Sequence, residues 1–194
     1  MLTLPLRHQY LIGSILIVLM IVTREYHFAS LHNLPGASWA VFFLAGIYLS
    51  SNWSLFGFLA LAWALDSSAY FTVAESEFCL TSAYVFLLPA YSALWAAGRW
   101  FATRYQFSWR ALAPLSISLL IGTIVCELFS SGGFYFFSDQ FEETTFTEFW
   151  QRELHYFPLY LQSLLLYVST AAAIHTLFVL THRTRQPQTN VIGQ

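Results

Sequence analysis

Long apolar stretches separated by short polar segments make up most of this chain. They lie at residues 10–23, 38–50, 54–70, 80–100, 111–136 and 156–181. A helix needs roughly 20 apolar residues to cross the hydrocarbon core of a bilayer, so this pattern predicts six transmembrane helices. The second and third stretches are short, and only Ser51, Asn52 and Trp53 separate them. On length alone, they could also form one bent helix.

The arginines distinguish between five and six spans. With six spans, only Arg24 and Arg152 fall on one side of the membrane, and the other side receives Arg7, Arg99, Arg104, Arg110, Arg183 and Arg185. This asymmetry follows the positive-inside rule, whereas five spans would place the two arginine-rich ends on opposite sides. We therefore expect six spans with both termini in the cytoplasm. Residues 1–182 form a single membrane domain, and 183–194 form a flexible cytoplasmic tail.

The composition agrees with a membrane protein and excludes several other classes. Hydrophobic residues make up 57% of the 194 residues and charged residues only 9%, far below the usual quarter of a soluble domain. Six spans leave no room for a second domain. The chain has no lysine and a net charge of -2, so it offers no basic surface for nucleic acid.

Acidic and aromatic residues gather on the side of the membrane that has few arginines. Three predicted outer loops, at residues 24–37, 71–79 and 137–153, contain or adjoin most of the acids. Many of the 19 phenylalanines, 11 tyrosines and 7 tryptophans lie near the same ends of the spans. Single aromatic residues there are typical of the interfacial belt. Together they are also able to line a large, partly apolar ligand site.

Cys79 is the first candidate for chemistry, at the point where the second outer loop enters the fourth span. A helix start can lower the pKa of a thiol, and a thiolate is a soft metal ligand. The alternative role is that of a small apolar filler. His27 could ligate a metal with it or make an interfacial hydrogen bond. Cys126, deep in the fifth span, is expected to pack in the interior.

Ionisable residues within or beside the spans are the next candidates. Asp66 and Glu127 are expected to face a cavity or a partner, because a charge at that depth is costly. Arg152 is the natural mate of an outer acid, although it could equally extend towards the surface. His175, deeper in the last span, is expected to make a helix contact. The sequence contains no Gly-x-Ser-x-Gly, His-Glu-x-x-His, phosphate-loop or dinucleotide motif.

The segments at 38–46, SWAVFFLAG, and at 66–84 resemble the BtuM family of bacterial cobalamin transporters. This family is related to the substrate-binding S-components of energy-coupling-factor (ECF) transporters. The resemblance implies an all-α, six-helix protein of the bacterial inner membrane that takes up cobalamin from its outer face. It also implies that Cys79 is an axial ligand of cobalt and that the outer loops close over the corrin. We expect the corrin to contact His27, Asp66, Phe78, Cys79, Tyr84, Tyr135 and Arg152.

The resemblance leaves activity and partners open. A thiolate on cobalt would make removal of the upper ligand, such as cyanide, chemically plausible. S-components commonly carry an alanine-x-x-x-alanine motif on the first helix, where this chain has only Gly13 and Ser14 as small residues. Partnership with an ECF energising module is therefore undecided. Two other classes remain: an intramembrane metal-dependent enzyme that uses Cys79 with histidine and acid ligands, and a structural membrane assembly protein.

Overall fold

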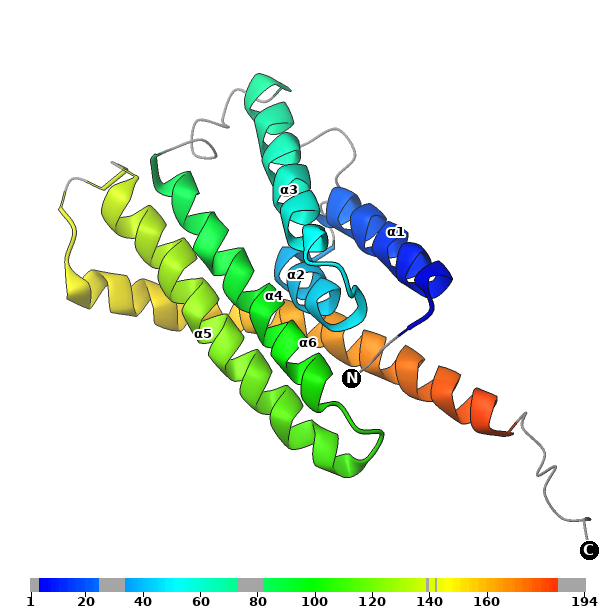
Figure 1. Ribbon diagram of the computed structural model, residues 1–194. Helices are drawn as coiled ribbons and strands as arrows, with labels where there is room; N and C mark the ends of the chain where they lie inside the picture. The colour runs from blue at the N-terminus through cyan, green and yellow to red at the C-terminus, as the bar shows by residue number, and fades with distance from the viewer. Residues whose placement is uncertain (1–3, 25–33, 73–81, 139, 142, 185–194) are drawn as a thin grey trace, which may run out of the picture.

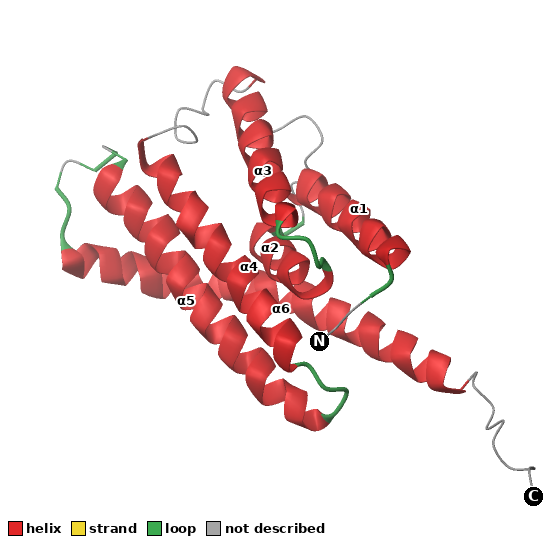
Figure 2. Ribbon diagram, viewed as in Figure 1, coloured by secondary structure: helices red, strands yellow, loops and turns green. Residues whose placement is uncertain are grey.

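The computed structural model describes residues 4–24, 34–72, 82–138, 140–141 and 143–184. Within these residues the fold is all-helical (Figure 2). Six α-helices and two short 3-10 helices follow one another along the chain (Figure 1): α1 (Leu6–Thr23), α2 (Ser38–Tyr48), α3 (Trp53–Thr72), η2 (Ser82–Phe86), α4 (Leu87–Arg104), η3 (Trp109–Ala111), α5 (Leu112–Phe137) and α6 (Phe146–Thr184). The prediction of six helices, with the second and third as separate helices, is confirmed.

Three of the helices are long and apolar enough to cross a membrane. They cover Leu6–Thr23, Trp109–Phe137 and Phe146–Thr181. Large apolar side chains lie on their outer faces, as expected of helices in contact with lipid: Ile15 is 56% exposed, Ile121 is 58% exposed and Leu166 is 51% exposed. The part of the chain that the structure describes is therefore suited to a multi-pass membrane protein.

Two predicted helix boundaries are wrong. The last helix begins at Phe146, ten residues before the predicted start, so the third outer loop is much shorter than 137–153. With 39 residues, α6 is roughly 58 Å long at 1.5 Å per residue, which exceeds the hydrocarbon core of a bilayer. Helix α4 begins only at Leu87, because residues 82–86 form the 3-10 helix η2.

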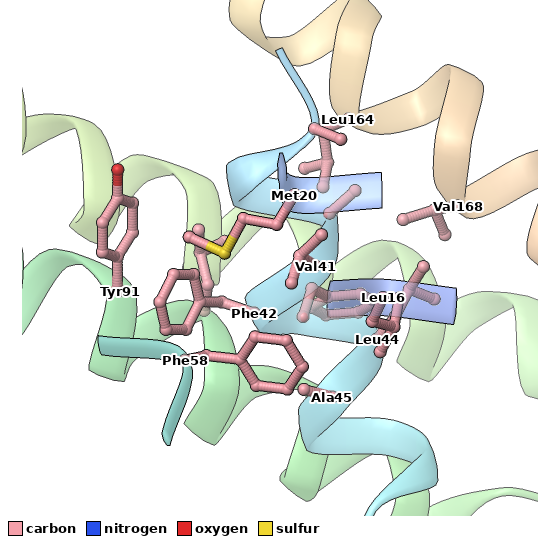
Figure 3. Packing of buried hydrophobic residues seen from close by; sticks show 14 of the residues in the cluster. Leu16, Met20, Val41, Phe42, Leu44, Ala45, Phe58, Tyr91, Leu164 and Val168 are labelled. Atoms are coloured by element: carbon pink, nitrogen blue, oxygen red, sulfur yellow. The ribbon is translucent and has the colours of Figure 1, made fainter. Parts of the chain in front are cut away.

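Helix α2 lies at the centre of the bundle (Figure 3). Eight of its eleven residues are buried. Phe42 stacks on Tyr91 of α4 with ring centroids 4.3 Å apart, and it meets Phe58 of α3 edge to face at 6.2 Å. Met20 of α1 and Leu164 of α6 complete this core. The apolar run that predicted the second span therefore packs mainly against other helices.

Glycines let α2 and α4 approach until their backbones touch. A Cβ atom added to Gly46 would overlap the carbonyl oxygen of Trp95, and one added to Gly98 would overlap that of Phe43. Backbone contact of this kind is typical of helices packed in membranes, where small residues permit close approach. The crossing fixes α4 against the central helix.

The two ends of the described chain lie at the same end of the bundle. The ring of His8, in the first turn of α1, meets Phe178, near the end of α6, at a centroid distance of 6.0 Å. Gln9 Oε1 also accepts hydrogen bonds of 2.8 Å from both the backbone N–H and the hydroxyl of Ser50, between α2 and α3. We call this the Tyr105 end, after the residue that follows α4, and the opposite end the Arg24 end.

Candidate ligand-binding site

A buried ion pair joins α1 to α3 at the Arg24 end. The guanidinium of Arg24 donates from Nε to Asp66 Oδ1 and from Nη2 to Oδ2, both at 2.5 Å. The two side chains are only 11% and 13% exposed. Two parallel charge-assisted bonds of this kind fix the orientation of both groups. The expectation that Asp66 faces a partner is confirmed.

Three further side chains complete the polar cluster around this pair. Arg24 Nη1 donates to Ser38 Oγ at 2.9 Å, and the hydroxyl of Tyr84 donates to Asp66 Oδ2 at 2.8 Å. The guanidinium carbon of Arg24 lies 6.0 Å from the centroid of the Tyr91 ring, which permits a cation–π interaction. The cluster therefore links α1, α2, α3, η2 and α4. Helices far apart in sequence meet at one charged centre.

The position of Arg24 follows from how α1 ends. Arg24 has an extended backbone, and its N–H donates to Met20 O, so the helix stops just before the charged residue. Thr23 Oγ1 accepts a 3.2 Å bond from Ala37 N, which holds the start of α2 next to the end of α1. Burial alone would lower the pKa of the Arg24 guanidinium, but the charge and hydrogen bonds of Asp66 outweigh this effect and raise that pKa. Arg24 thus stays charged.

A cavity of about 520 Å³ opens beside the cluster. This volume lies within the range of small-molecule sites. Its walls are aromatic and aliphatic, with polar groups from the cluster and from α5 and α6, and its lining is Thr23, Arg24, Pro35, Gly36, Ser38, Trp39, Asp66, Ala83, Tyr84, Leu87, Tyr91, Ser130, Phe134, Leu159, Tyr160 and Ser163. We refer to it as the Arg24 cavity.

Helix α6 closes one side of the Arg24 cavity through bonds to the segment before α2. Ser163 Oγ donates to Gly36 O at 2.6 Å, and Tyr167 Oη donates to Pro35 O at 2.7 Å. The rings of Trp39 and Tyr160 lie 5.3 Å apart across this junction. The cavity therefore has an aromatic wall made by two helices that are distant in sequence.

The seven predicted site residues fall into three groups. Asp66 and Tyr84 line the Arg24 cavity. Tyr135 and Arg152 do not line it. The remaining three, His27, Phe78 and Cys79, lie outside the described residues.

Tyr135 and Arg152 form a separate contact between α5 and α6. The hydroxyl of Tyr135 donates to Glu148 Oε2 at 3.2 Å and accepts a bond from Thr145 N at 3.0 Å. Arg152 Nη1 lies 3.8 Å from Glu148 Oε1, and its guanidinium carbon lies 4.7 Å from the centroid of the Phe141 ring. Arg152 therefore does pair with an acidic residue, as expected. Both side chains of the ion pair are nearly half exposed to solvent, so the pair contributes little to stability.

Other sequence expectations concern the interior. Cys126 is fully buried in the core, which confirms its packing role. Glu127 is 3% exposed, and its Oε1 accepts a 2.8 Å bond from Ser131 on the same helix. His175 makes the expected helix contact, because its ring centroid lies 5.8 Å from that of Tyr48 in α2, and its Nε2 also lies 2.9 Å from the hydroxyl of Tyr105.

Sequence reasoning did not select Arg24, Ser38 or Trp39 as site residues. Arg24 had a usable signal, because it is one of only two arginines on the predicted outer side and directly follows an apolar helix. Ser38 and Trp39 had none, since small polar and aromatic residues are common at helix starts.

The Arg24 cavity is built for a neutral or weakly charged amphipathic ligand. Its arginine and carboxylate already neutralise each other, while their remaining lone pairs and N–H groups can still bond amides or hydroxyls. Aromatic walls suit a flat ring system. Among the described residues, no three His, Cys, Asp or Glu side chains gather as they would around a metal ion.

Fold and site together define a helical protein with three helices able to cross a membrane and a ligand-sized cavity at one end of the bundle. Searches of protein-family models and of curated protein sequences found no match to this chain.

Proposed function

We propose that this chain is a multi-pass protein of the bacterial inner membrane that binds cobalamin at the Arg24 end and takes it up from the outer face. The observation that carries this proposal is the Arg24 cavity, which combines aromatic walls with a bidentate ion pair. The corrin of cobalamin is a flat ring with a rim of amides. Aromatic rings can cover its face, and Arg24, Asp66 and Tyr84 can bond its amides.

Cobalamin is larger than the Arg24 cavity, so only part of the molecule would enter it in the conformation described. The resemblance to the BtuM family supplies the rest of the proposal. By that resemblance, the thiolate of Cys79 takes one axial position of cobalt, with His27 and Phe78 close to the corrin. A thiolate donor would weaken the bond to the opposite ligand and so favour loss of cyanide.

The proposed topology has six spans with both termini in the cytoplasm. The contact between His8 and Phe178 supports it, since both described ends lie at the Tyr105 end. So does the distribution of arginines, with Arg99, Arg104 and Arg110 in the last turns of α4 and the connection that follows it. The Arg24 end would then face outward.

A binding titration tests the proposal. Purified protein in detergent is mixed with hydroxocobalamin or cyanocobalamin, and the absorbance spectrum of the corrin is followed. We expect saturable binding with a spectral shift, and Cys79→Ala should remove the shift. Absence of saturable binding would rule out the function, whereas an unchanged spectrum in Cys79→Ala would rule out only the cobalt ligand.

Two serines of α6 offer a matched pair for locating the ligand. Ser163 lines the Arg24 cavity, whereas Ser169 is exposed and bonds only the carbonyl of Leu166 in its own helix. Ser163→Trp should lower cobalamin affinity at least tenfold by filling the cavity, and Ser169→Trp should leave it unchanged. Equal affinities for the two variants would place the cobalamin site elsewhere.

A further inference from the structure

A second cavity, of about 490 Å³, opens at the Tyr105 end, far from the Arg24 cavity. Its lining comes from α2, from the end of α4 and the connection to α5, from the first turn of α5, and from the second half of α6: Leu44, Ile47, Tyr48, Phe101, Tyr105, Gln106, Phe107, Ser108, Trp109, Ala111, Leu112, Leu115, Val168, Ala172, His175, Thr176 and Leu180. We refer to it as the Tyr105 cavity. It shares no lining residue with the Arg24 cavity.

The Tyr105 cavity is apolar in its depth and polar at its rim. Leu44, Phe101 and Val168 are each 5% exposed and form the deep part. Gln106 and Ser108, in the exposed connection between α4 and α5, form the rim. An occupant must therefore have a long apolar part and a polar group at one end.

The mouth of the Tyr105 cavity is continuous with the apolar outer surface of the bundle. Leu112 and Leu180 line the cavity, yet they are 52% and 47% exposed. Trp109, at the same mouth, is 88% exposed, as is typical of a tryptophan at a membrane interface. An apolar chain in the surrounding hydrocarbon would thus reach the cavity without crossing water.

Two arginines adjoin lining residues in the sequence, and the guanidinium carbon of one of them, Arg104, lies 4.4 Å from the centroid of the Trp100 ring. Arg104 directly precedes the lining residue Tyr105, and Arg110 lies between the lining residues Trp109 and Ala111. Both arginines are exposed, and the lining contains no carboxylate. Basic groups at a pocket between transmembrane helices are typical of sites for anionic lipid headgroups.

We propose that the Tyr105 cavity binds one anionic phospholipid, with an acyl chain in the apolar depth and its phosphate at Arg104 and Arg110. The side chains of Tyr105 and His175, joined by a hydrogen bond of 2.9 Å, form the wall along which the acyl chain would lie. The proposal is independent of the ligand of the Arg24 cavity. In the proposed topology, this site opens to the cytoplasmic leaflet, where anionic lipids attract basic residues.

Native mass spectrometry tests this site on the full-length protein after delipidation and addition of phosphatidylglycerol or phosphatidylcholine. We expect one tightly retained phosphatidylglycerol per chain. In the double variant Arg104→Gln and Arg110→Gln, its retention relative to phosphatidylcholine should fall roughly tenfold or more. These two side chains are exposed, so the variant should fold normally. Equal retention of the two lipids by the unmodified protein would overturn the proposal.

A pair of substitutions in α6 tests the acyl-chain position. Ala172 lines the Tyr105 cavity, whereas Leu177 is 63% exposed and does not line it. Ala172→Trp should abolish retention of the single lipid, and Leu177→Trp should retain it. Loss of the bound lipid in both variants, or in neither, would mean that the lipid binds on the outer surface of the bundle. Either result would refute the proposed site. Should Ala172→Trp fail to fold, the arginine variant still decides the matter.

Discussion

The close crossing of α2 and α4 predicts how substitutions at its glycines change the free energy of unfolding. Gly98→Ala places a methyl group on the carbonyl oxygen of Phe43, and that oxygen belongs to a buried backbone that cannot rotate away. The two helices must separate, which loosens the stacked rings of Phe42 and Tyr91 beside the crossing. Overpacking costs about 1–3 kcal/mol. We expect Gly98→Ala to lower the free energy of unfolding by at least about 2 kcal/mol, despite the better helix propensity of alanine.

Gly46 lies on the other side of the same crossing, so the two substitutions should not be additive. Once one methyl group has pushed the helices apart, the second meets less resistance. Gly46→Ala alone should cost as much as Gly98→Ala, and the double variant should cost less than their sum. Reversible unfolding of purified protein by sodium dodecyl sulfate in mixed micelles, followed by circular dichroism, measures these differences.

Gly57 of α3 is the matched control. A Cβ atom added there has no neighbouring atom within 4 Å. Because glycine weakens a helix interior by up to about 1 kcal/mol relative to alanine, Gly57→Ala should leave stability unchanged or raise it. If Gly98→Ala were as stable as Gly57→Ala, the close approach of α2 and α4 would be refuted.

Three more predictions test the other contacts. Asp66→Asn leaves Arg24 buried without its counter-ion and should lower the free energy of unfolding by about 3 kcal/mol, measured in the same assay; a change below about 1 kcal/mol would contradict burial of the pair. Tyr84→Phe removes only the hydrogen bond to Asp66 and should cost about 1.5 kcal/mol, clearly less than Asp66→Asn. A cysteine introduced at Thr145 into a variant with both native cysteines changed to serine should react with an impermeant maleimide from the outer side of intact spheroplasts. Labelling only after lysis would mean that the topology is the opposite of the one proposed.

Helix existence was predictable from sequence, and helix ends were less so. The apolar runs predicted all six helices, because burial in lipid or protein demands the same side chains. The first ten residues of α6 include Glu148, Arg152 and Glu153, and these charges predicted a loop. A helix that projects beyond the hydrocarbon core can carry such residues on its exposed face, so hydropathy does not mark its start.

The environment of each helix was less predictable than its existence. An apolar run is expected of a helix in contact with lipid and of one surrounded by protein. The contacts that bury α2 are those of Gly46 with Trp95 and of the Phe42 ring with Tyr91 and Phe58. All three partners lie in other helices. Single-sequence reasoning has no measure of such distant contacts.

The sequence predicted a residue of the candidate site only where burying that residue has a high energetic cost by itself. Asp66 was selected because a carboxylate at that depth demands a partner. Its partner, Arg24, lies 42 positions earlier and was identified only by the structure. Tyr135 and Arg152 were predicted to lie near the corrin, but their side chains contact Glu148 and do not line the Arg24 cavity. Residues on the same side of a membrane lie at a similar depth, but the packing of the helices determines which of their side chains come into contact.

The two cavities lie at opposite ends of the bundle, and the buried side chains of α2 occupy the space between these ends. A ligand that passes from one end to the other therefore requires a helix to move. Helix α2 is held to α4 by backbone contact at Gly46 and Gly98, which resists separation. Helix α6 forms hydrogen bonds next to both cavities, from Ser163 and Tyr167 at one end and through His175 at the other, and its Leu164 and Val168 pack in the core between them. Each such bond contributes only about 1 kcal/mol net. A lipid in the Tyr105 cavity would oppose displacement of α6 by binding it to the end of α4.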